Sequence, residues 1–224
     1  MTILFVLLTF IVVIGFKYFV YAAENVPAEV EARPRMQVRA MAPVMTKEAG
    51  FDIPKGYGFH PGHTWVLREG RENARVGLDK FAADLIGTID RIDVPDESRW
   101  VRQGQRLATL HSNNVSVDLL SPVEGVVMAI NKDVLAHPEL ALRDPYKDGW
   151  IAILKSPDLP TNQKNLMQGS MVAPWMHYSI TRLNSAAAQS NPALAQDGGF
   201  PMGQGLASLP QEVREKLLKD FLLN

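Results

Sequence analysis

The residues most suggestive of chemistry are two closely spaced histidines, His60 and His63, separated by Pro61-Gly62. Imidazole nitrogens are common zinc ligands, but a protein zinc site needs three or four ligands. No carboxylate or third histidine lies nearby in the sequence, and a Pro-Gly pair favours a turn. We therefore expect no metal here, and we expect His63 to play a structural role beside Trp65.

The remaining histidines, His111, His137 and His177, are isolated, and nothing in the sequence pairs them with a serine or aspartate in a recognisable nucleophilic arrangement. Acidic residues cluster between Asp90 and Glu97. Carboxylates acquire catalytic properties in a buried cleft, so we interpret this cluster as a solvated loop. The chain has no cysteine, which excludes thiolate metal sites and cysteine nucleophiles. We expect the protein not to be an enzyme.

Composition and charge narrow the class of protein further. Of the 224 residues, 46% are hydrophobic and 21% are charged, which suffices for a packed core. Lysine and arginine total 23 and aspartate and glutamate total 24, for a formal net charge of -1. Nucleic-acid binding draws on an excess of basic side chains that neutralise phosphates, so this balance gives no support to it.

The middle of the chain has the pattern of a mainly β protein. Short β-type runs separated by Gly, Pro, Asp and Asn cover residues 64–67, 74–78, 87–94, 106–111, 116–120, 126–131 and 150–154. A short helix is expected over residues 80–86, where the apolar residues share one face. Asn113-Asn114 suits a turn, because asparagine tolerates a positive φ. Many short strands with close turn signals predict a β-sandwich or a small barrel.

The N-terminal segment is far more apolar than the rest of the chain. Residues 2–23 are apolar apart from two threonines and Lys17, and a helix of about 20 such residues spans a bilayer. A cleaved signal peptide is the competing interpretation, but it needs a basic region before its apolar run, and no lysine or arginine precedes Lys17. We expect a transmembrane anchor over residues 1–24, in contact with the lipid bilayer through residues 2–23, and a stalk over residues 25–50.

Basic residues set the expected orientation of this anchor. The lysines and arginines lie at the C-terminal end of the apolar run or after it, with only the α-amino group before it. The positive-inside rule then places the N-terminus outside and the following domain in the cytoplasm. The prediction is a single-pass protein of the cell inner (cytoplasmic) membrane.

The C-terminal part of the chain is expected to be helical and extended. Thr161 is expected to cap a helix that ends near Pro174, and residues 185–207 are expected to form a flexible linker. Residues 208–224 are expected to form an amphipathic helix. Its apolar face is our candidate partner-binding site: Val213, Leu217, Leu218, Phe221 and Leu222. Such a helix docks on its own domain or on another chain, and the sequence leaves both open.

Several separated motifs carry a resemblance to a known family. They are His63-Thr64-Trp65-Val66, Val76-Gly77-Leu78-Asp79-Lys80-Phe81-Ala82, Leu85-Ile86-Gly87, Leu120-Ser121-Pro122-Val123-Glu124-Gly125-Val126-Val127, Asn131, His137-Pro138-Glu139-Leu140 and Asp144-Pro145-Tyr146-Lys147-Asp148-Gly149-Trp150. In this order they resemble the H-protein of the glycine cleavage system, over about residues 56–155. The resemblance implies a lipoyl/biotinyl-domain-like fold, a flattened β-sandwich or hybrid barrel with short helices. We therefore expect an H-protein-like β domain over residues 51–184.

The resemblance also implies a cofactor site that this chain does not complete. In that family a lysine at a hairpin tip carries lipoate, and the matching position here is Asn114, with a family glutamate position at His111. No lysine lies between Lys80 and Lys132, so a small shift of the alignment does not restore one. Lipoate is attached through an amide to a lysine ε-amino nitrogen, and an asparagine side-chain amide is not nucleophilic. We expect no lipoyl group and no other cofactor on this chain.

These expectations combine into a non-catalytic role. We expect a membrane-anchored accessory or scaffold subunit of a larger integral membrane protein complex, such as a respiratory or photosynthetic one. Its H-protein-like domain would serve protein–protein contacts with the other subunits. The alternative is a membrane-tethered carrier or regulator linked to glycine cleavage or lipoate metabolism. No nucleic-acid partner is expected in either case.

Overall fold

The computed structural model describes residues 43–48, 51–190 and 210–223. The chain divides into two units, residues 1–40 and 41–224, and the first lies outside the described residues. The predicted anchor over residues 1–24 therefore stays a prediction. Within the described ranges, no helix is both long enough and apolar enough to cross a membrane.

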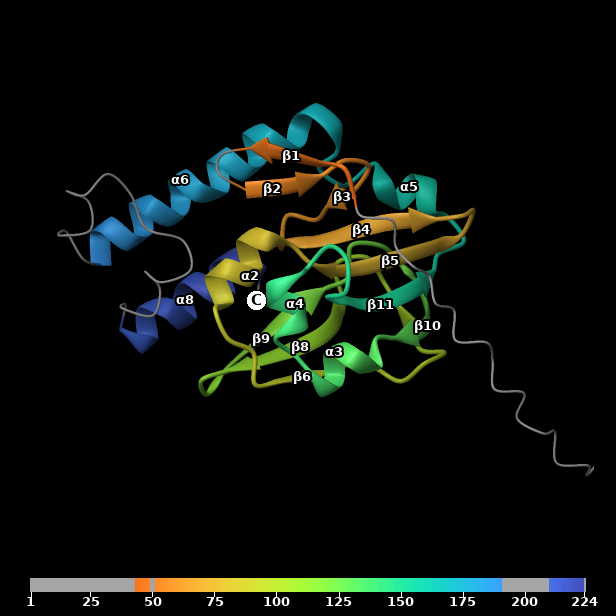
Figure 1. The fold of residues 1–224 in the computed structure, drawn as a ribbon, viewed down its shortest axis with the longest axis horizontal. Helices are drawn as coiled ribbons and strands as arrows, with labels where there is room; N and C mark the ends of the chain where they lie inside the picture. Colours follow the sequence, from red (N-terminus) through yellow and green to blue (C-terminus); the bar gives the residue numbers. More distant parts are fainter. Residues whose placement is uncertain (1–42, 49–50, 191–209, 224) are drawn as a thin grey trace, which may run out of the picture. The chain divides into compact units, whose positions relative to one another are not determined.

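The described part of the second unit is mainly β, as predicted, with antiparallel sheets and helices around them (Figure 1). A two-stranded sheet pairs β1 (Met45–Glu48) with β2 (Phe51–Pro54). A six-stranded sheet has the order β3 (Gly58–Phe59), β4 (Thr64–Glu69), β5 (Asn73–Leu78), β11 (Trp150–Lys155), β10 (Gly125–Ile130) and β7 (Trp100–Val101). A three-stranded sheet has the order β6 (Arg91–Asp93), β8 (Arg106–Ser112) and β9 (Val115–Leu120).

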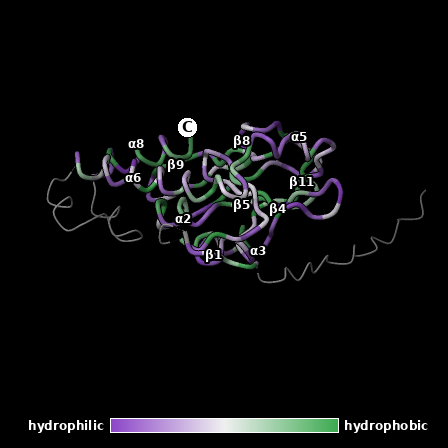
Figure 2. The backbone as a smooth tube through the Cα atoms, turned by 90° about the horizontal axis from the view of Figure 1, so that it is seen from above, coloured by the Kyte–Doolittle hydropathy of each residue, from purple (hydrophilic) through white to green (hydrophobic). Residues whose placement is uncertain are grey.

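Helices connect and cover these strands. They are α2 (Lys80–Ile86), α3 (Lys132–Ala136), α4 (Leu140–Arg143), α5 (Leu159–Gln163), the short 3-10 helix η1 (Gly169–Met171), α6 (Val172–Ser190) and α8 (Gln211–Leu222). Hydrophobic and hydrophilic residues alternate along α8, as expected for a helix with one covered face (Figure 2).

Within the described residues, the buried apolar side chains form one core between the inner faces of the two larger sheets. Val76 and Leu154 enter it from the six-stranded sheet, and Leu110 and Leu119 enter it from the three-stranded sheet. Side chains alternate along a strand, so the opposite face of β8 and β9 is left with polar residues. This alternation gives the three-stranded sheet one buried face and one face toward solvent.

The helix predicted over residues 80–86 is confirmed as α2. The Asp79 carboxylate caps its N-terminus, since Oδ1 accepts a hydrogen bond from the Ala82 backbone N–H at 2.8 Å. Gly87 ends the helix with a φ of 75°, a left-handed conformation that favours glycine. Both ends of the helix are therefore determined by residues that can be recognised in the sequence.

The sequence motifs meet in one aromatic cluster beside this helix. Trp65 Nε1 donates to the carbonyl of Pro145 at 3.1 Å, and the Tyr57 hydroxyl donates to the carbonyl of Tyr146 at 3.0 Å. The Tyr146 hydroxyl accepts from the Lys80 backbone N–H at 3.0 Å. These bonds tie β4, α2 and the segment after α4 together, which gives the motif residues a structural role.

Gly77 is required by the close approach of the Trp65 ring. A Cβ atom at this position would lie 2.7 Å from Trp65 Cζ2, closer than van der Waals contact allows. We expect Gly77→Ala to lower the free energy of unfolding by about 1–3 kcal/mol, the usual cost of overpacking a core. Chemical denaturation measures this cost. Asn73→Ala, at an exposed position of the same strand, is the control, and equal effects of the two variants would contradict the assignment.

The buried hydroxyl of Tyr57 leads us to expect a loss of stability at alkaline pH. Burial raises the pKa of Tyr57 from 10.0 to about 12. Because the folded-state pKa is the higher one, the contribution of the neutral phenol is complete below pH 10 and is lost as the pH rises toward about 12. We expect Tyr57→Phe to show a shallower fall in unfolding free energy across this interval. Urea unfolding of both proteins at several pH values tests this, and equal slopes would contradict it.

The prediction of one helix that starts at Thr161 and ends near Pro174 is wrong. The chain instead forms α5, then a backbone pairing of Met167 with Phe59, and then the long helix α6. Pro174 lies in the first turn of α6, where a proline is tolerated because the N–H it lacks has no intrahelical acceptor. The proline therefore marks the start of a helix and not the end of one. The linker predicted over residues 185–207 is helical up to Ser190.

Part of the stalk predicted over residues 25–50 has regular structure. Met45–Glu48 forms β1, which pairs with β2 in an antiparallel register from Met45–Pro54 to Glu48–Phe51. Phe51 and Ile53 bury their side chains in the core from β2. Residues 25–42 and 49–50 of the predicted stalk lie outside the described residues.

Candidate functional site

The β8–β9 hairpin ends in the two-residue turn Asn113-Asn114. The two residues have φ values of 48° and 65°, in the left-handed region that asparagine adopts more readily than most residues. Ser112 and Val115 pair directly before and after them. A positive φ at both central positions is typical of the type I′ turns that close tight hairpins. The turn predicted at these asparagines is confirmed, and both side chains are exposed.

Side-chain hydrogen bonds hold this hairpin tip against the segment between α2 and β6. The backbone N–H of Asn113 donates to Asp90 Oδ2 at 2.8 Å, and Asn113 Nδ2 donates to Thr88 Oγ1 at 2.8 Å. The Thr88 hydroxyl also lies 3.2 Å from the Ser112 hydroxyl. The tip is therefore a fixed turn. Asp90 contributes to it directly, so this member of the acidic cluster is more than a solvated loop residue.

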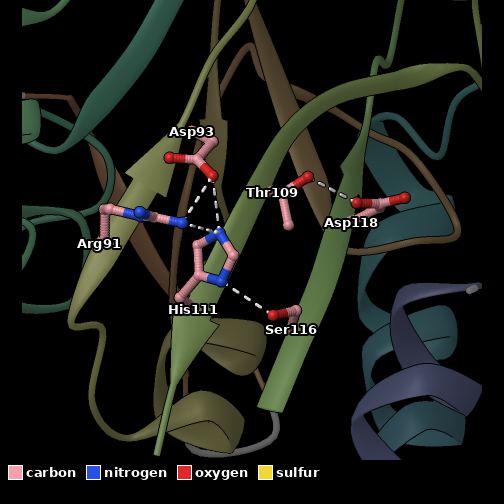
Figure 3. A network of polar contacts seen from close by, with 6 residues as sticks. All are labelled: Arg91, Asp93, Thr109, His111, Ser116 and Asp118. Atoms are coloured by element: carbon pink, nitrogen blue, oxygen red, sulfur yellow. Dashed lines mark hydrogen bonds and ion pairs between the residues drawn. The ribbon is translucent and has the colours of Figure 1, made fainter. Parts of the chain in front are cut away.

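The outward face of the same sheet carries a chain of polar side chains (Figure 3). His111 lies at its centre: Nδ1 is 2.8 Å from the Ser116 hydroxyl, and Nε2 is 2.8 Å from Asp93 Oδ2. Arg91 Nη2 lies 3.0 Å from the same carboxylate oxygen and 3.1 Å from Nε2. These side chains come from three different strands, β6, β8 and β9.

The prediction that His111 is isolated from serine and aspartate is wrong. The turn at Asn113-Asn114 sets the register in which His111 faces Ser116, and β6 pairs with β8 so that Arg91 faces His111. The predicted turn already implied the first of these pairings, because residues two positions either side of a two-residue hairpin loop lie opposite each other. This was the signal in the sequence that could have found the cluster.

The chemistry of this cluster follows from its proton positions and its exposure. With the proton on Nε2, His111 donates to Asp93, and its Nδ1 lone pair accepts the Ser116 hydroxyl proton. This order of hydroxyl, imidazole and carboxylate occurs in hydrolases. Here, however, the Arg91 and Asp93 side chains are 66% and 52% exposed, and water screens charges at such a surface. An open polar face of this kind suits recognition of another surface.

A second polar pair continues the face toward α8. The Thr109 hydroxyl donates to Asp118 Oδ1 at 2.8 Å, from β8 to β9 (Figure 3). Helix α8 lies against β9, so the polar face is bordered by α8 along its β9 edge. The hairpin tip, the polar face and α8 are thus neighbours in the fold.

His63 is buried in a stack of rings, which confirms its predicted structural role. Its side chain is 1% exposed, and Nδ1 lies 2.8 Å from the buried carboxylate of Asp79. Its ring stacks between Phe81, at a centroid distance of 4.2 Å, and Trp175, at 4.8 Å. His60 Nδ1 accepts the Gly62 backbone N–H at 3.0 Å. Burial, with a smaller effect of His63, lowers the pKa of His60.

The apolar side of α8 is directed at its own domain. Leu217, Leu218, Phe221 and Leu222 are each at most 5% exposed, and Val213 is partly buried against the same core. Of the two docking modes left open by the sequence, the structure shows docking on the chain's own domain. Of the five side chains predicted as a partner-binding surface, four are therefore covered and Val213 is partly covered.

Comparison with known proteins identifies the family of this fold. The family model for the glycine cleavage H-protein matches residues 58–177, which is more than half of the chain. This chain belongs to the glycine cleavage H-protein family. The glycine cleavage system H protein of Thermus thermophilus is 34% identical over 108 residues, covering 48% of this chain and 84% of that protein.

Other members of the H-protein family match the same region. The glycine cleavage system H protein of Magnetococcus marinus is 32% identical over 124 residues, covering 55% of this chain and 87% of that protein. The crystal structure of a glycine cleavage system H protein from Mycobacterium marinum aligns with a TM-score of 0.44 and 23% identity, covering 47% of this chain and 87% of that chain. The family match ends inside α6, so α8 lies beyond it.

The hairpin tip does not fit the lipoate that the H-protein family resemblance implies. The residues there are Asn113 and Asn114, and the sequence contains no lysine from residue 81 to residue 131. Lys80 and Lys132 lie at the starts of α2 and α3, outside the hairpin. No ε-amino nitrogen is therefore available at the tip for an amide bond to lipoate.

Proposed function

We propose that this protein is a non-catalytic, membrane-anchored accessory or scaffold subunit whose H-protein-like domain binds partner proteins. The observation that carries the proposal is the hairpin tip, where two asparagines form a tied-down type I′ turn in a stretch without lysine. A carrier needs a long arm that moves between enzymes. A fixed turn without a lysine gives such an arm no point of attachment, and it offers a rigid surface for binding instead.

The polar face beside this tip is the surface that we assign to partner recognition. It presents a cation, a carboxylate, an imidazole and a hydroxyl, each within hydrogen-bonding distance of at least one other, on strands that a common core holds in place. Arrays of mixed charge add specificity to an interface more than affinity. A partner with a complementary arrangement would therefore bind in one defined orientation.

The apolar run at residues 2–23 supports the membrane part of the proposal. The basic residues after it support an orientation with the domain in the cytoplasm. Tethering of a rigid binding domain to the bilayer is the arrangement expected of an accessory subunit in a membrane complex, for example a respiratory or photosynthetic one.

Extraction of the native membrane in mild detergent tests this proposal. We expect the protein to co-migrate with a stable set of other subunits in native electrophoresis and size-exclusion chromatography. Exchange of His111 and Ser116 for alanine should release it from that assembly, whereas exchange of the exposed Lys147 and Asp148 should not. A protein that migrates alone and monodisperse under gentle extraction would contradict the proposal.

A second candidate function follows from family membership alone. The matched relatives are named as glycine cleavage system H proteins, so a carrier or regulator linked to glycine cleavage or lipoate metabolism is the alternative. It predicts that the full chain binds the other proteins of the glycine cleavage system without being modified. Surface plasmon resonance measures this binding, and an absence of measurable binding would discard the alternative.

A further inference from the structure

The outer side of the six-stranded sheet carries an exposed tryptophan at its β7 edge. Side chains alternate along a strand, and Val101 is buried, so Trp100 faces away from the core. The Trp100 side chain is 46% exposed. Trp100 pairs with Val126 on β10, and Val126 pairs with the exposed Lys155 on β11. This row of residues therefore lies on the outer side of the sheet.

Apolar side chains continue the outer side along β10 and β11, which are neighbours in the sheet (Figure 1). Ala129 on β10 pairs with Ile153 on β11, and both side chains are partly exposed, as is Val126. Met128 lies where the register shifts between Val127 and Ala129, and it is 47% exposed. We name this surface the β7–β10 face and define it by five residues: Trp100, Val126, Met128, Ala129 and Ile153.

The charged side chains at this edge balance one another. Arg99 and Arg102 stand directly before and after β7, and both are exposed. Asp96 and Glu97 come shortly before them in the chain, are also exposed, and offset their charge. A contact at the β7–β10 face therefore depends on its apolar side chains more than on net charge.

A lipid bilayer matches the chemistry of this face. Tryptophan is enriched where a membrane meets water, because its ring combines an apolar body with a polar N–H. Arginine side chains lay their stems along apolar surface and keep the charged group in the polar region, where headgroup phosphates lie. Arg99 and Arg102 place such side chains on either side of Trp100.

The sequence also keeps the domain close to the membrane of the proposed anchor. The apolar run ends at residue 23, and residues 24–44 separate it from β1. A chain of that length spans at most about 75 Å. Contact between the domain and the bilayer is then intramolecular, so it needs little affinity of its own.

We propose that the β7–β10 face docks on the surface of the membrane that holds the anchor, with the Trp100 ring and the Met128 side chain in the interfacial region. This inference rests on the proposed membrane anchor and adds the side of the domain that contacts the bilayer. The polar face on β6, β8 and β9 belongs to the other sheet, across the core. Docking in this orientation therefore leaves the polar face free for partner proteins.

Quenching of tryptophan fluorescence by brominated lipids tests the docking. All four tryptophans lie between residues 65 and 175, and none lies in the apolar run, so the quenching reports on the domain alone. The full chain is placed in phosphatidylcholine nanodiscs whose acyl chains are brominated or unaltered. We expect brominated acyl chains to quench the unaltered protein, and we expect most of this quenching to be lost in Trp100→Phe.

A second pair of variants keeps all four tryptophans. Met128→Asp places a charge on the β7–β10 face, and charged side chains are costly in a bilayer, so it should abolish the quenching. Tyr178→Asp is the matched control, at a position of α6 that is 64% exposed, and it should keep the quenching. Met128→Ser replaces Met128→Asp if that variant does not fold, and it should reduce the quenching.

Several results would overturn the proposal. They are an absence of quenching in a chain that co-elutes with the nanodiscs, full quenching in Met128→Asp or Met128→Ser, and equal losses in Met128→Asp and Tyr178→Asp. Protection of Trp100 from acrylamide in the native complex alone, without quenching in nanodiscs, would assign the face to a partner protein instead.

These measurements separate the inference from the proposed function. A chain that does not co-elute with nanodiscs would remove the anchor and this inference together. Quenching in a protein that migrates alone from its native membrane would keep the docked face and remove the accessory role. A protein that stays in its complex but shows no quenching would keep the role and remove the docked face.

Discussion

Replacement of Asn114 by lysine is expected to create a lipoylated protein from an unmodified one. The side chain at this position is exposed at the tip of the β8–β9 hairpin, so a lysine there would present its ε-amino group to a lipoate ligase. Lysine in a left-handed conformation costs about 1–2 kcal/mol, which a folded domain tolerates. Incubation with lipoate, ATP and a lipoate ligase, followed by intact mass spectrometry, should show the added lipoyl mass on most Asn114→Lys chains.

Two controls make this result interpretable. The unaltered chain should keep the mass of its sequence under the same conditions. Asn113→Lys places the same group one residue earlier, where the native side chain donates to Thr88, and it should be modified far less. A lipoyl mass on the unaltered chain, or equal modification of both lysine variants, would contradict the role assigned to the tip.

Asp79→Ala is expected to lower the free energy of unfolding by about 3–5 kcal/mol, the usual result of removing one partner from a buried pair. Asp79 is fully buried, and its two carboxylate oxygens have separate partners, His63 Nδ1 and the Ala82 backbone N–H. Its removal leaves the ring nitrogen of His63 without its acceptor in a ring stack and uncaps α2. Urea unfolding followed by tryptophan fluorescence measures the change.

Asp84→Ala is the matched control on the same helix. Asp84 pairs with Lys80, whose side chain is 37% exposed, and pairs near the surface contribute about 0–1 kcal/mol. A cost for Asp79→Ala no larger than that for Asp84→Ala would show that the buried pair does not hold the ring cluster together.

The elements that could be predicted from the sequence are those whose limits are set by local chemistry. Asp79 and Gly87 mark both ends of α2, and Asn113-Asn114 marks the turn of the β8–β9 hairpin, so the positions of both follow from the sequence. Short strands lie where apolar runs stand between turn residues, as for β5 and β11. In each case the residues that decide the structure are neighbours in the sequence.

The features that could not be predicted depend on contacts between distant parts of the chain. Met167 pairs with Phe59 across more than a hundred residues, and this pairing interrupts the helix expected after Thr161. Strand β1 forms because its backbone pairs with that of β2. The polar cluster around His111 needs β6 at its side as well as the hairpin. The preference of a short segment for helix or strand contains no information about such long-range pairings.

Part of the candidate site could be predicted from the sequence. The absence of lysine from residue 81 to residue 131 is visible in the sequence alone, and the structure adds that the hairpin tip is hydrogen-bonded to the segment before β6. Helix α8 is recognisable as amphipathic from its sequence, but only the fold shows that Phe81 and His63 receive it.

We propose that this member of the H-protein family works without a lipoyl arm. Intact mass spectrometry of the full chain purified from its native cells tests this proposal most directly. We predict a mass without any lipoyl addition, and peptide mapping should recover the segment from residue 107 to residue 132 unmodified. A lipoyl mass on that segment, at any residue, would contradict the claim.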